Sequence, residues 1–190
     1  MPMLTIEKLN TVVEEFDVNS DGYSVCIETG TYMGDTVRNM QPYFEQYHTI
    51  EISPFLHQKF LAEHPPYGNV TIHLGDSSDV IPQLLEKLAE VQKCVFWLDG
   101  HFSSGCTSKG DKDVPLIEEC KAIDTLYKPD EGLILIDDLR LFGTDHAEDW
   151  ADITVENVLE CFDNFEVKHY EHPDDMLCLY ITRKEVEFTE

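Results

Sequence analysis

Acidic side chains recur along this sequence directly after short apolar runs of the kind that form buried strands. These residues are Glu28, Glu51, Asp76, Asp99 and Asp137, each separated from the next by the length of a strand–helix unit. In an open parallel sheet the carboxyl ends of the strands share one edge, and ligands bind there. Carboxylates gathered at that edge can hold a hydroxyl, an ammonium group or a metal ion. Any single one could instead cap a helix, Asp76 above all.

Residues 24–37 predict a buried strand, a tight turn and the start of a helix. Gly30 and Gly34 permit backbone conformations closed to other residues, and Gly30 lets a ligand approach closely. Free N–H groups at the helix start, near Thr36, would attract the negative end of a ligand, while Glu28 suits an ammonium or hydroxyl group. Both features together suit a ligand with an amino acid end and a nucleoside end. The alternative is an ordinary strand-to-helix turn.

Apolar patterns along the rest of the chain predict one domain, 1–190, with a helical segment at 1–20 and a Rossmann-like core at 24–183. The helix after the first turn should run to about Tyr47, and a later one from Ser78 or Asp79 to Val91. The last two strands, 165–171 and 176–183, are joined by a connection too short for a parallel crossover and form an antiparallel hairpin. The prediction is a doubly wound α/β fold, a mostly parallel sheet with helices on both faces.

The amino-acid composition limits the kinds of partner that the protein could bind. Asp and Glu number 38 against 13 Lys and Arg, a formal charge of −25 that makes nucleic acid and anionic membrane surfaces poor partners. Much of this charge could simply keep the protein soluble. We expect a cytoplasmic protein, because the sequence shows no signal peptide, no membrane-spanning run and no CxxC spacing among its cysteines. A homo-oligomer is compatible with the sequence.

From Ser24 to Arg183 the chain resembles the class I S-adenosylmethionine-dependent methyltransferases. Glu28-Thr-Gly30-Thr-Tyr-Met-Gly34 is similar to the family's first motif, although Thr31 and Tyr32 stand where another glycine is frequent. The resemblance implies seven strands in the order 3-2-1-4-5-7-6, ribose contacts at Glu51 and an adenine contact at Asp76. The implied cofactor-binding residues are Glu28, Gly30, Thr31, Tyr32, Gly34, Thr36, Glu51, Ile52, Asp76 and Ser77.

Asp99 with Asp137 and Asp138 resembles a narrower group, the metal-dependent O-methyltransferases that act on catechols and sugars. The resemblance implies that these three acids hold Mg²⁺, a hard cation that binds substrate hydroxyls and lowers the pKa of one of them. Asp137 and Asp138 could instead bind Arg140 or backbone N–H groups. His101 stands where the sugar-modifying branch often has a third acid, and it is a candidate general base or metal ligand.

These residues predict methylation of a small hydroxylated molecule such as a sugar, with Asp99 and His101 as catalytic residues and S-adenosylmethionine and Mg²⁺ as cofactors. The loop 101–113, with Lys109 and Lys112, would form a lid over the substrate. The opposite wall would hold Phe142, His146 and Trp150. Three alternatives stay open: a non-catalytic methyltransferase-like binding domain, an NAD-binding oxidoreductase and a metallophosphoesterase.

Overall fold

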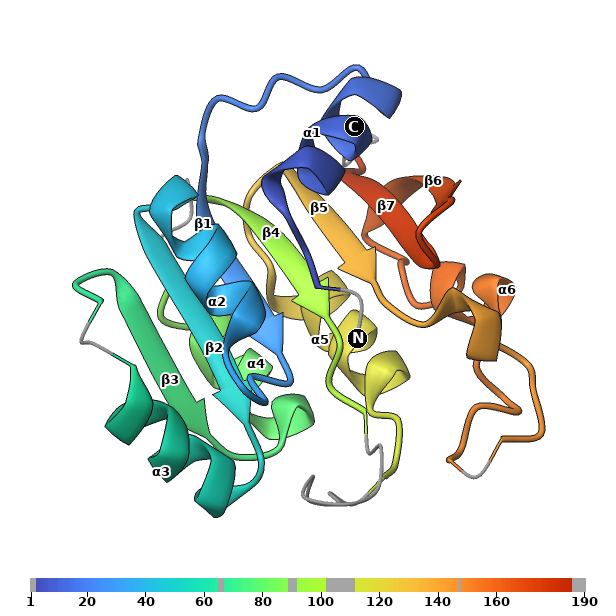
Figure 1. Ribbon diagram of the computed structural model, residues 1–190. Coiled ribbons are helices and arrows are strands. Elements are labelled where there is room, and N and C mark those ends of the chain that lie inside the picture. Colours follow the sequence, from blue (N-terminus) through green and yellow to red (C-terminus); the bar gives the residue numbers. More distant parts are fainter. Residues whose placement is uncertain (1–2, 65–66, 89–91, 102–111, 147, 186–190) are drawn as a thin grey trace.

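The fold is built on one seven-stranded sheet with the order β3-β2-β1-β4-β5-β7-β6. This computed structural model describes residues 3–64, 67–88, 92–101, 112–146 and 148–185 (Figure 1). Strand β7 is antiparallel to both of its neighbours, and the other pairs are parallel. The predicted doubly wound sheet, its strand order and its terminal hairpin are confirmed. The strands are β1 (Tyr23–Thr29), β2 (Gln46–Glu51), β3 (Val70–Leu74), β4 (Lys93–Leu98), β5 (Glu131–Ile136), β6 (Phe165–His172) and β7 (Met176–Arg183).

Helices cover both faces of the sheet and enclose two apolar cores. One core lies beneath α1 (Ile6–Glu15), α2 (Asp35–Met40) and α3 (Pro54–Glu63). The other lies beneath α4 (Ser77–Leu85), α5 (Leu116–Leu126) and α6 (Val155–Leu159). In Figure 1, α2 lies in front of the sheet, while α4 and α5 lie behind it.

The alternation of side chains along the strands decides which face each acid at a strand end approaches. Glu28, Asp99 and Asp137 each follow, by two residues, a strand residue of the core beneath α1, α2 and α3. Alternation therefore directs all three toward that face of the sheet. The strand residues that precede them are Cys26, Trp97 and Leu135.

Two helix predictions were wrong in their bounds. The helix after the first turn ends at Met40, is followed by a 3₁₀ turn at Gln41–Tyr43, and gives way to β2 at Gln46. Pro42 accounts for this, because proline cannot donate the hydrogen bond that a continuing α-helix needs. The later helix, α4, is capped by Asp76 rather than by Ser78 or Asp79 and ends at Leu85.

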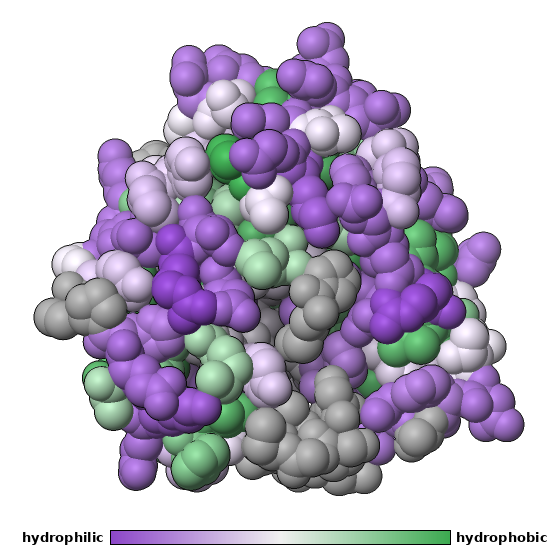
Figure 2. Space-filling model, in the orientation of Figure 1, coloured by the Kyte–Doolittle hydropathy of each residue, from purple (hydrophilic) through white to green (hydrophobic). Residues whose placement is uncertain are grey.

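The face of the molecule shown in Figure 2 is largely hydrophilic, as the acidic composition leads one to expect. Hydrophobic residues are scattered over this face in small groups. Within the described ranges, no helix combines the length and the apolar character that crossing a membrane requires.

The start of α2 makes a sharp prediction about stability. Gly34 has φ +73°, and a Cβ there would lie 2.5 Å from Cε2 of Phe60 in α3. Replacing Gly34 with alanine should therefore lower the free energy of unfolding by about 1–3 kcal/mol, through backbone strain and overpacking. Urea denaturation measures the loss. Gly68→Ala is the matched control, since a Cβ at Gly68 meets nothing within 4 Å; equal losses in both variants would contradict the prediction.

Candidate functional site

The turn after β1 brings the ends of three strands together. The N–H groups of Gly30 and Thr31 both donate to the carbonyl of Ile50 at the end of β2, at 3.0 and 3.2 Å. Gly30 has φ +81°, and a Cβ there would lie 2.4 Å from the carbonyl oxygen of Asp99, which follows β4. Only glycine fits between these backbones. The group that lies close to Gly30 is therefore another part of the chain, the backbone of Asp99, whereas the sequence predicted a ligand there.

Glu51, predicted to bind ribose, lies directly against this turn. Its Oε2 accepts the backbone N–H of Tyr32 at 2.9 Å, and its Oε1 accepts that of Ser53 at 2.8 Å. Burial raises the pKa of Glu51, while these two N–H donors lower it. Tyr32 has φ +46°, a conformation that is unusual for a bulky residue, and its bond to Glu51 helps to hold it. Each carboxylate oxygen has a further lone pair with which to accept a ligand hydroxyl.

The start of α2 offers less to an anion than the sequence led us to expect. The helix has only six residues, and its first turn carries Asp35. A short helix has a small dipole, and a carboxylate in its first turn already uses the favourable potential there. Thr36 is buried, and its side chain faces the Glu28 carboxyl rather than an open pocket.

Glu28 lies beneath the turn and is only 1% exposed. The Tyr47 hydroxyl donates to its Oε2 at 3.1 Å. Burial raises the pKa of Glu28 to about 8, against the hydrogen bonds from Thr49, Tyr47 and Thr36 that lower it. The carboxyl is therefore largely uncharged near pH 7, unless a cation comes close.

A group of acids meets where β1, β4 and β5 end. Burial raises the pKa of Asp99 well above its usual range, and the charges of Asp137, Asp138 and Glu28 raise it further. Burial and the neighbouring Asp138 also raise the pKa of Asp137, to about 7. Both carboxylate oxygens of Asp137 are buried without a hydrogen-bond partner. The predicted gathering of strand-end acids is therefore present on these three strands, and among the described residues only Asp138 of this group has an ion pair with an arginine or lysine, Arg140.

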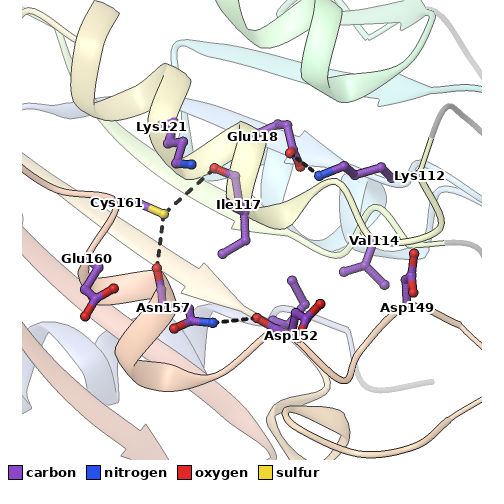
Figure 3. Close-up of a pocket in the computed structure, with 11 residues that line it drawn as sticks. Lys112, Val114, Ile117, Glu118, Lys121, Asp149, Asp152, Asn157, Glu160 and Cys161 are labelled. Atoms are coloured by element: carbon purple, nitrogen blue, oxygen red, sulfur yellow. Dashed lines mark hydrogen bonds and ion pairs between the residues drawn. The ribbon is translucent and has the colours of Figure 1, made fainter.

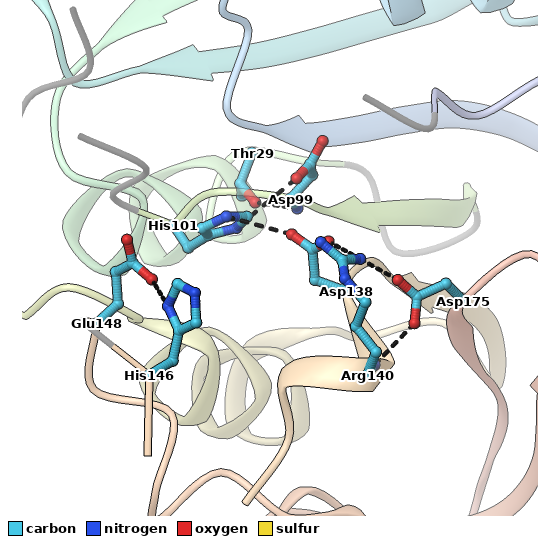
Figure 4. A network of polar contacts seen from close by, with 8 residues as sticks. All are labelled: Thr29, Asp99, His101, Asp138, Arg140, His146, Glu148 and Asp175. Carbon is cyan, nitrogen blue, oxygen red and sulfur yellow. Dashed lines mark hydrogen bonds and ion pairs between the residues drawn. The ribbon is translucent and has the colours of Figure 1, made fainter. Parts of the chain in front are cut away.

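His101 lies between two of these acids (Figure 4). Its Nε2 is 3.2 Å from Oδ2 of Asp138, and its Nδ1 is 3.8 Å from Oδ1 of Asp99. One ligand atom from each of these residues lies within 4.8 Å of the others, so the three could hold a metal ion. This group has His101 where the sequence predicted Asp137. Burial lowers the pKa of His101, although Asp138 and Glu148 oppose that effect.

A polar chain that the sequence did not predict fixes Asp138. Asp138 has φ +60°, and Arg140 contacts both its carboxylate and that of Asp175 (Figure 4). Asp175 belongs to the turn between β6 and β7, and it also accepts the backbone N–H of Arg140 at 2.7 Å. The predicted alternative, in which Asp138 binds Arg140, is present together with the contact to His101.

Asp76 and Ser77 lie at the start of α4, where Asp76 is the N-cap. Its Oδ1 accepts the backbone N–H and the hydroxyl of Ser78, at 3.0 and 2.7 Å. The capping role anticipated for Asp76 is therefore real, and a contact to adenine would use its other oxygen. Ser77 is buried beside Glu119 of α5, a residue that sequence reasoning missed.

The predicted walls of the substrate pocket are described only in part. Trp150 is 2% exposed, its ring lies 5.3 Å from that of His101, and Phe142 stacks on it. Trp150 therefore supports His101 from the side. Most of the predicted lid, residues 102–111 with Lys109, lies outside the described residues.

A groove of about 500 Å³ lies between α5 and α6, away from the strand ends (Figure 3). Its walls are mostly charged, with Lys112 paired to Glu118. None of the predicted cofactor, metal or catalytic residues lines it.

No protein-family model matches the sequence, and no curated protein is similar enough in sequence to count as a relative. Solved structures are similar in fold. The 23S rRNA methyltransferase ErmE has a TM-score of 0.55 and 11% identity over 99% of this chain and 72% of that one. A SAM-dependent methyltransferase from Anabaena variabilis has a TM-score of 0.58 and 11% identity over 97% and 88%. A spermidine synthase in complex with the transition state analogue AdoDATO has a TM-score of 0.53 and 13% identity over 88% and 57%.

The architecture is therefore that of SAM-dependent methyltransferases, with their Rossmann-like sheet and reversed seventh strand. At such low identity the likeness concerns the fold alone. A spermidine synthase has the same fold, so the reaction has to be argued from the site.

The buried acids predict an unusual dependence of stability on pH. The pKa of Glu28 rises from an ordinary 4.5 to about 8, so the folded protein holds a proton there that the unfolded chain has lost. This contribution is fully present below pH 4.5 and is lost as the pH rises to about 8. Between pH 4.5 and about 8, the unfolding free energy of Glu28→Gln should rise relative to that of wild type by up to about 5 kcal/mol.

Urea denaturation at a series of pH values measures this gain. Glu45→Gln, on the exposed surface, is the matched control and should follow wild type. A curve for Glu28→Gln parallel to that of wild type would show that Glu28 is ionised in the folded protein.

Proposed function

We propose that this protein transfers a methyl group from S-adenosylmethionine to a hydroxyl oxygen of a small molecule such as a sugar. The observation that carries the proposal is the crowding of Asp99 by Glu28, Asp137 and Asp138 in a buried site. Acids buried without an opposite charge are costly, and a positively charged ligand relieves that cost. S-adenosylmethionine has a sulfonium and an ammonium group, and it supplies an electrophilic methyl group when bound.

Residues of the turn and its neighbours supply the other contacts that such a cofactor needs. Glu51 would accept the ribose hydroxyls while its two backbone partners hold it in place. Asp76 would accept the adenine amino group through Oδ2, since Ser78 uses Oδ1. Gly30, which donates to the Ile50 carbonyl and lies close to the backbone of Asp99, fixes the backbone on which the cofactor would lie.

His101 would act as the general base. Its Nε2 faces Asp138, which orients the ring, while Nδ1 is too far from Asp99 for a hydrogen bond and is left to accept a proton. The acceptor oxygen would form a bond to the methyl carbon as the carbon–sulfur bond breaks, and the hydroxyl proton would pass to Nδ1. Holding the groups in line inside a site with fixed charges provides most of the acceleration.

A divalent metal is a second proposed component. The convergence of Asp99, His101 and Asp138 favours it, as do the unpartnered oxygens of Asp137. When bound, a dication supplies a Lewis acid that lowers the pKa of a substrate hydroxyl. Two carboxylates with one imidazole suit Mn²⁺ or another transition metal better than Mg²⁺, which prefers oxygen ligands alone. In that case His101 would be a ligand rather than the base.

A small molecule as methyl acceptor suits the net charge of the protein better than RNA does. With a net charge of −25, the protein would repel a phosphate backbone. The antiparallel β7 between β5 and β6 separates this sheet from the dinucleotide-binding order of the NAD oxidoreductases. A domain that binds the cofactor without turnover differs from the proposed enzyme only in activity.

Binding of the cofactor can be tested directly by calorimetry with S-adenosylmethionine, with NAD and with buffer. We expect binding of S-adenosylmethionine only, weakened about tenfold or more in Glu51→Gln, because one charged acceptor is lost. Glu45→Gln should bind like wild type. Binding of NAD alone would overturn the proposal, and cofactor binding without methylation of any hydroxyl acceptor would favour the non-catalytic domain.

The role of the metal is tested by thermal melting with Mg²⁺, with Mn²⁺ and with EDTA. If the acids hold a dication, Mn²⁺ should raise Tm more than Mg²⁺, and Asp138→Asn should lose most of that rise while keeping its affinity for the cofactor. Asp145→Asn, on the exposed surface, is the control. Equal melting and equal turnover in EDTA would remove the metal from the scheme.

A further inference from the structure

Glu119 is a buried acid that the proposed chemistry leaves unused. It lies in α5, is 1% exposed, and has an oxygen, Oε1, that is buried without a hydrogen-bond partner. The side chains of Ser77 and Thr29 both face its carboxyl and lower its pKa. Glu119 therefore joins α5 to the start of α4 and to the end of β1.

A chain of polar groups leads from Glu119 to Asp99. The backbone N–H of Asp99 donates to Oγ1 of Thr29 at 3.1 Å. The Thr29 oxygen accepts that bond, so its own hydroxyl proton is available to the Glu119 carboxyl. Through Thr29, Glu119 acts on the backbone position of a proposed catalytic residue.

Gly100 completes this arrangement. A Cβ at Gly100 would lie 2.8 Å from Cβ and Oγ1 of Thr29 and 3.4 Å from Oε1 of Glu119. The chain therefore passes directly over Thr29 and Glu119 without a side chain between them. This crossing lies where β1 adjoins β4, the point at which the strand order reverses and where open α/β sheets bind their ligands.

A small cavity of about 10 Å³ lies beside Glu119 and reaches Trp150, whose Nε1 is also buried without a partner. This volume has room for about one water molecule, and such a site needs polar partners. Glu119 and Trp150 line the same cavity, the carboxyl of Glu119 as a hydrogen-bond acceptor and the indole N–H of Trp150 as a donor. Trp150 in turn packs against His101.

We propose that Glu119 is a positioning residue of the methyl-transfer site, holding the Asp99–His101 segment through Thr29 on one side and through a water shared with Trp150 on the other. The inference rests on the proposed function, because only that function makes the Asp99–His101 segment part of a catalytic site. The contacts of Glu119 do not depend on the proposed function. A neutral carboxyl suits this role, because it offers a proton as well as acceptors. Burial raises the pKa of Glu119 to about 8; Ser77 and Thr29 oppose the rise, and Asp76 and Glu118 add to it.

The first measurement needs no ligand: hydrogen exchange of the Asp99 amide at constant pH. We expect Glu119→Ala to exchange about tenfold faster than wild type, while Glu119→Gln, which keeps the size and a neutral polar group, stays within about twofold. Glu118→Gln, the neighbour that faces Lys112, is the matched control. Unchanged exchange in Glu119→Ala would overturn the inference. If that variant does not fold, the second measurement decides.

The second measurement is the affinity for S-adenosylmethionine between pH 6.5 and 9. Ionisation of the acids around Asp99 strengthens the attraction for a cationic cofactor in wild type and variant alike, so the quantity to compare is the ratio of the wild-type affinity to that of Glu119→Gln. This ratio should fall as the pH passes about 8, because an ionised Glu119 would no longer hold its neighbours in the same way. The same fall should appear when Glu28→Gln is compared with the double variant that also carries Glu119→Gln. A slope unaltered in Glu119→Gln would overturn the role of Glu119. If wild type binds no S-adenosylmethionine at all, the proposed function fails, and hydrogen exchange alone decides the role of Glu119.

Discussion

Acids buried close together at one edge of the sheet, where their ionisation is costly, are the constraint on which the rest of the site depends. The folded chain brings Glu28, Asp99 and Asp137 together in surroundings where each raises the cost of ionising another. A structure that served stability alone would replace such acids with apolar residues. Their presence at the carboxyl ends of β1, β4 and β5 is the reason that we propose a positively charged ligand at this edge.

The terminal hairpin adds two ion pairs at the same edge of the sheet as these acids. Because β7 runs antiparallel to β5, its first residues lie beside the last residues of β5, with Leu177 opposite Ile136. The turn before β7 therefore reaches the same edge as the acids. From there Asp175 binds Arg140, and Asp174 lies 3.7 Å from Lys8 of α1. The reversed strand thus brings two cations toward the acidic edge, where Arg140 contacts Asp138 as well as Asp175.

The edge of the sheet at which the acids gather could be predicted from the sequence. Apolar runs locate the strands, and a parallel sheet places all their carboxyl ends together. Whether an acid on a helix faces the core or the solvent could not be predicted in the same way. Adjacent acids illustrate the difficulty: Glu118 pairs with Lys112 at the surface, whereas Glu119 is buried under Gly100. Which of two neighbours points inward depends on the rotation of α5 against the sheet, and no local pattern records that rotation.

Other details depend on contacts between distant segments. In the converging group His101 stands where the sequence predicted Asp137, and its place there depends on a contact of its Nε2 with Asp138, in a distant segment of the chain. The left-handed conformation of Asp138 is set by Asp175 and Arg140, and no turn signal at 137–140 announces it. The early end of α2, by contrast, follows from a local signal, because Pro42 interrupts the helix although the apolar pattern continues.

The fold cannot choose the reaction, since methyltransferases and a spermidine synthase both have it. What they share is a sheet whose order reverses at one point and leaves an open edge there. In this chain acids lie on both faces at that point: Asp99 faces the acids on one side of β4, and Glu119 lies beneath Gly100 on the other. A ligand bound at the edge therefore meets charges whose positions are set from two cores at once. Such fixed charges are what electrostatic catalysis requires, because they need not reorganise during the reaction.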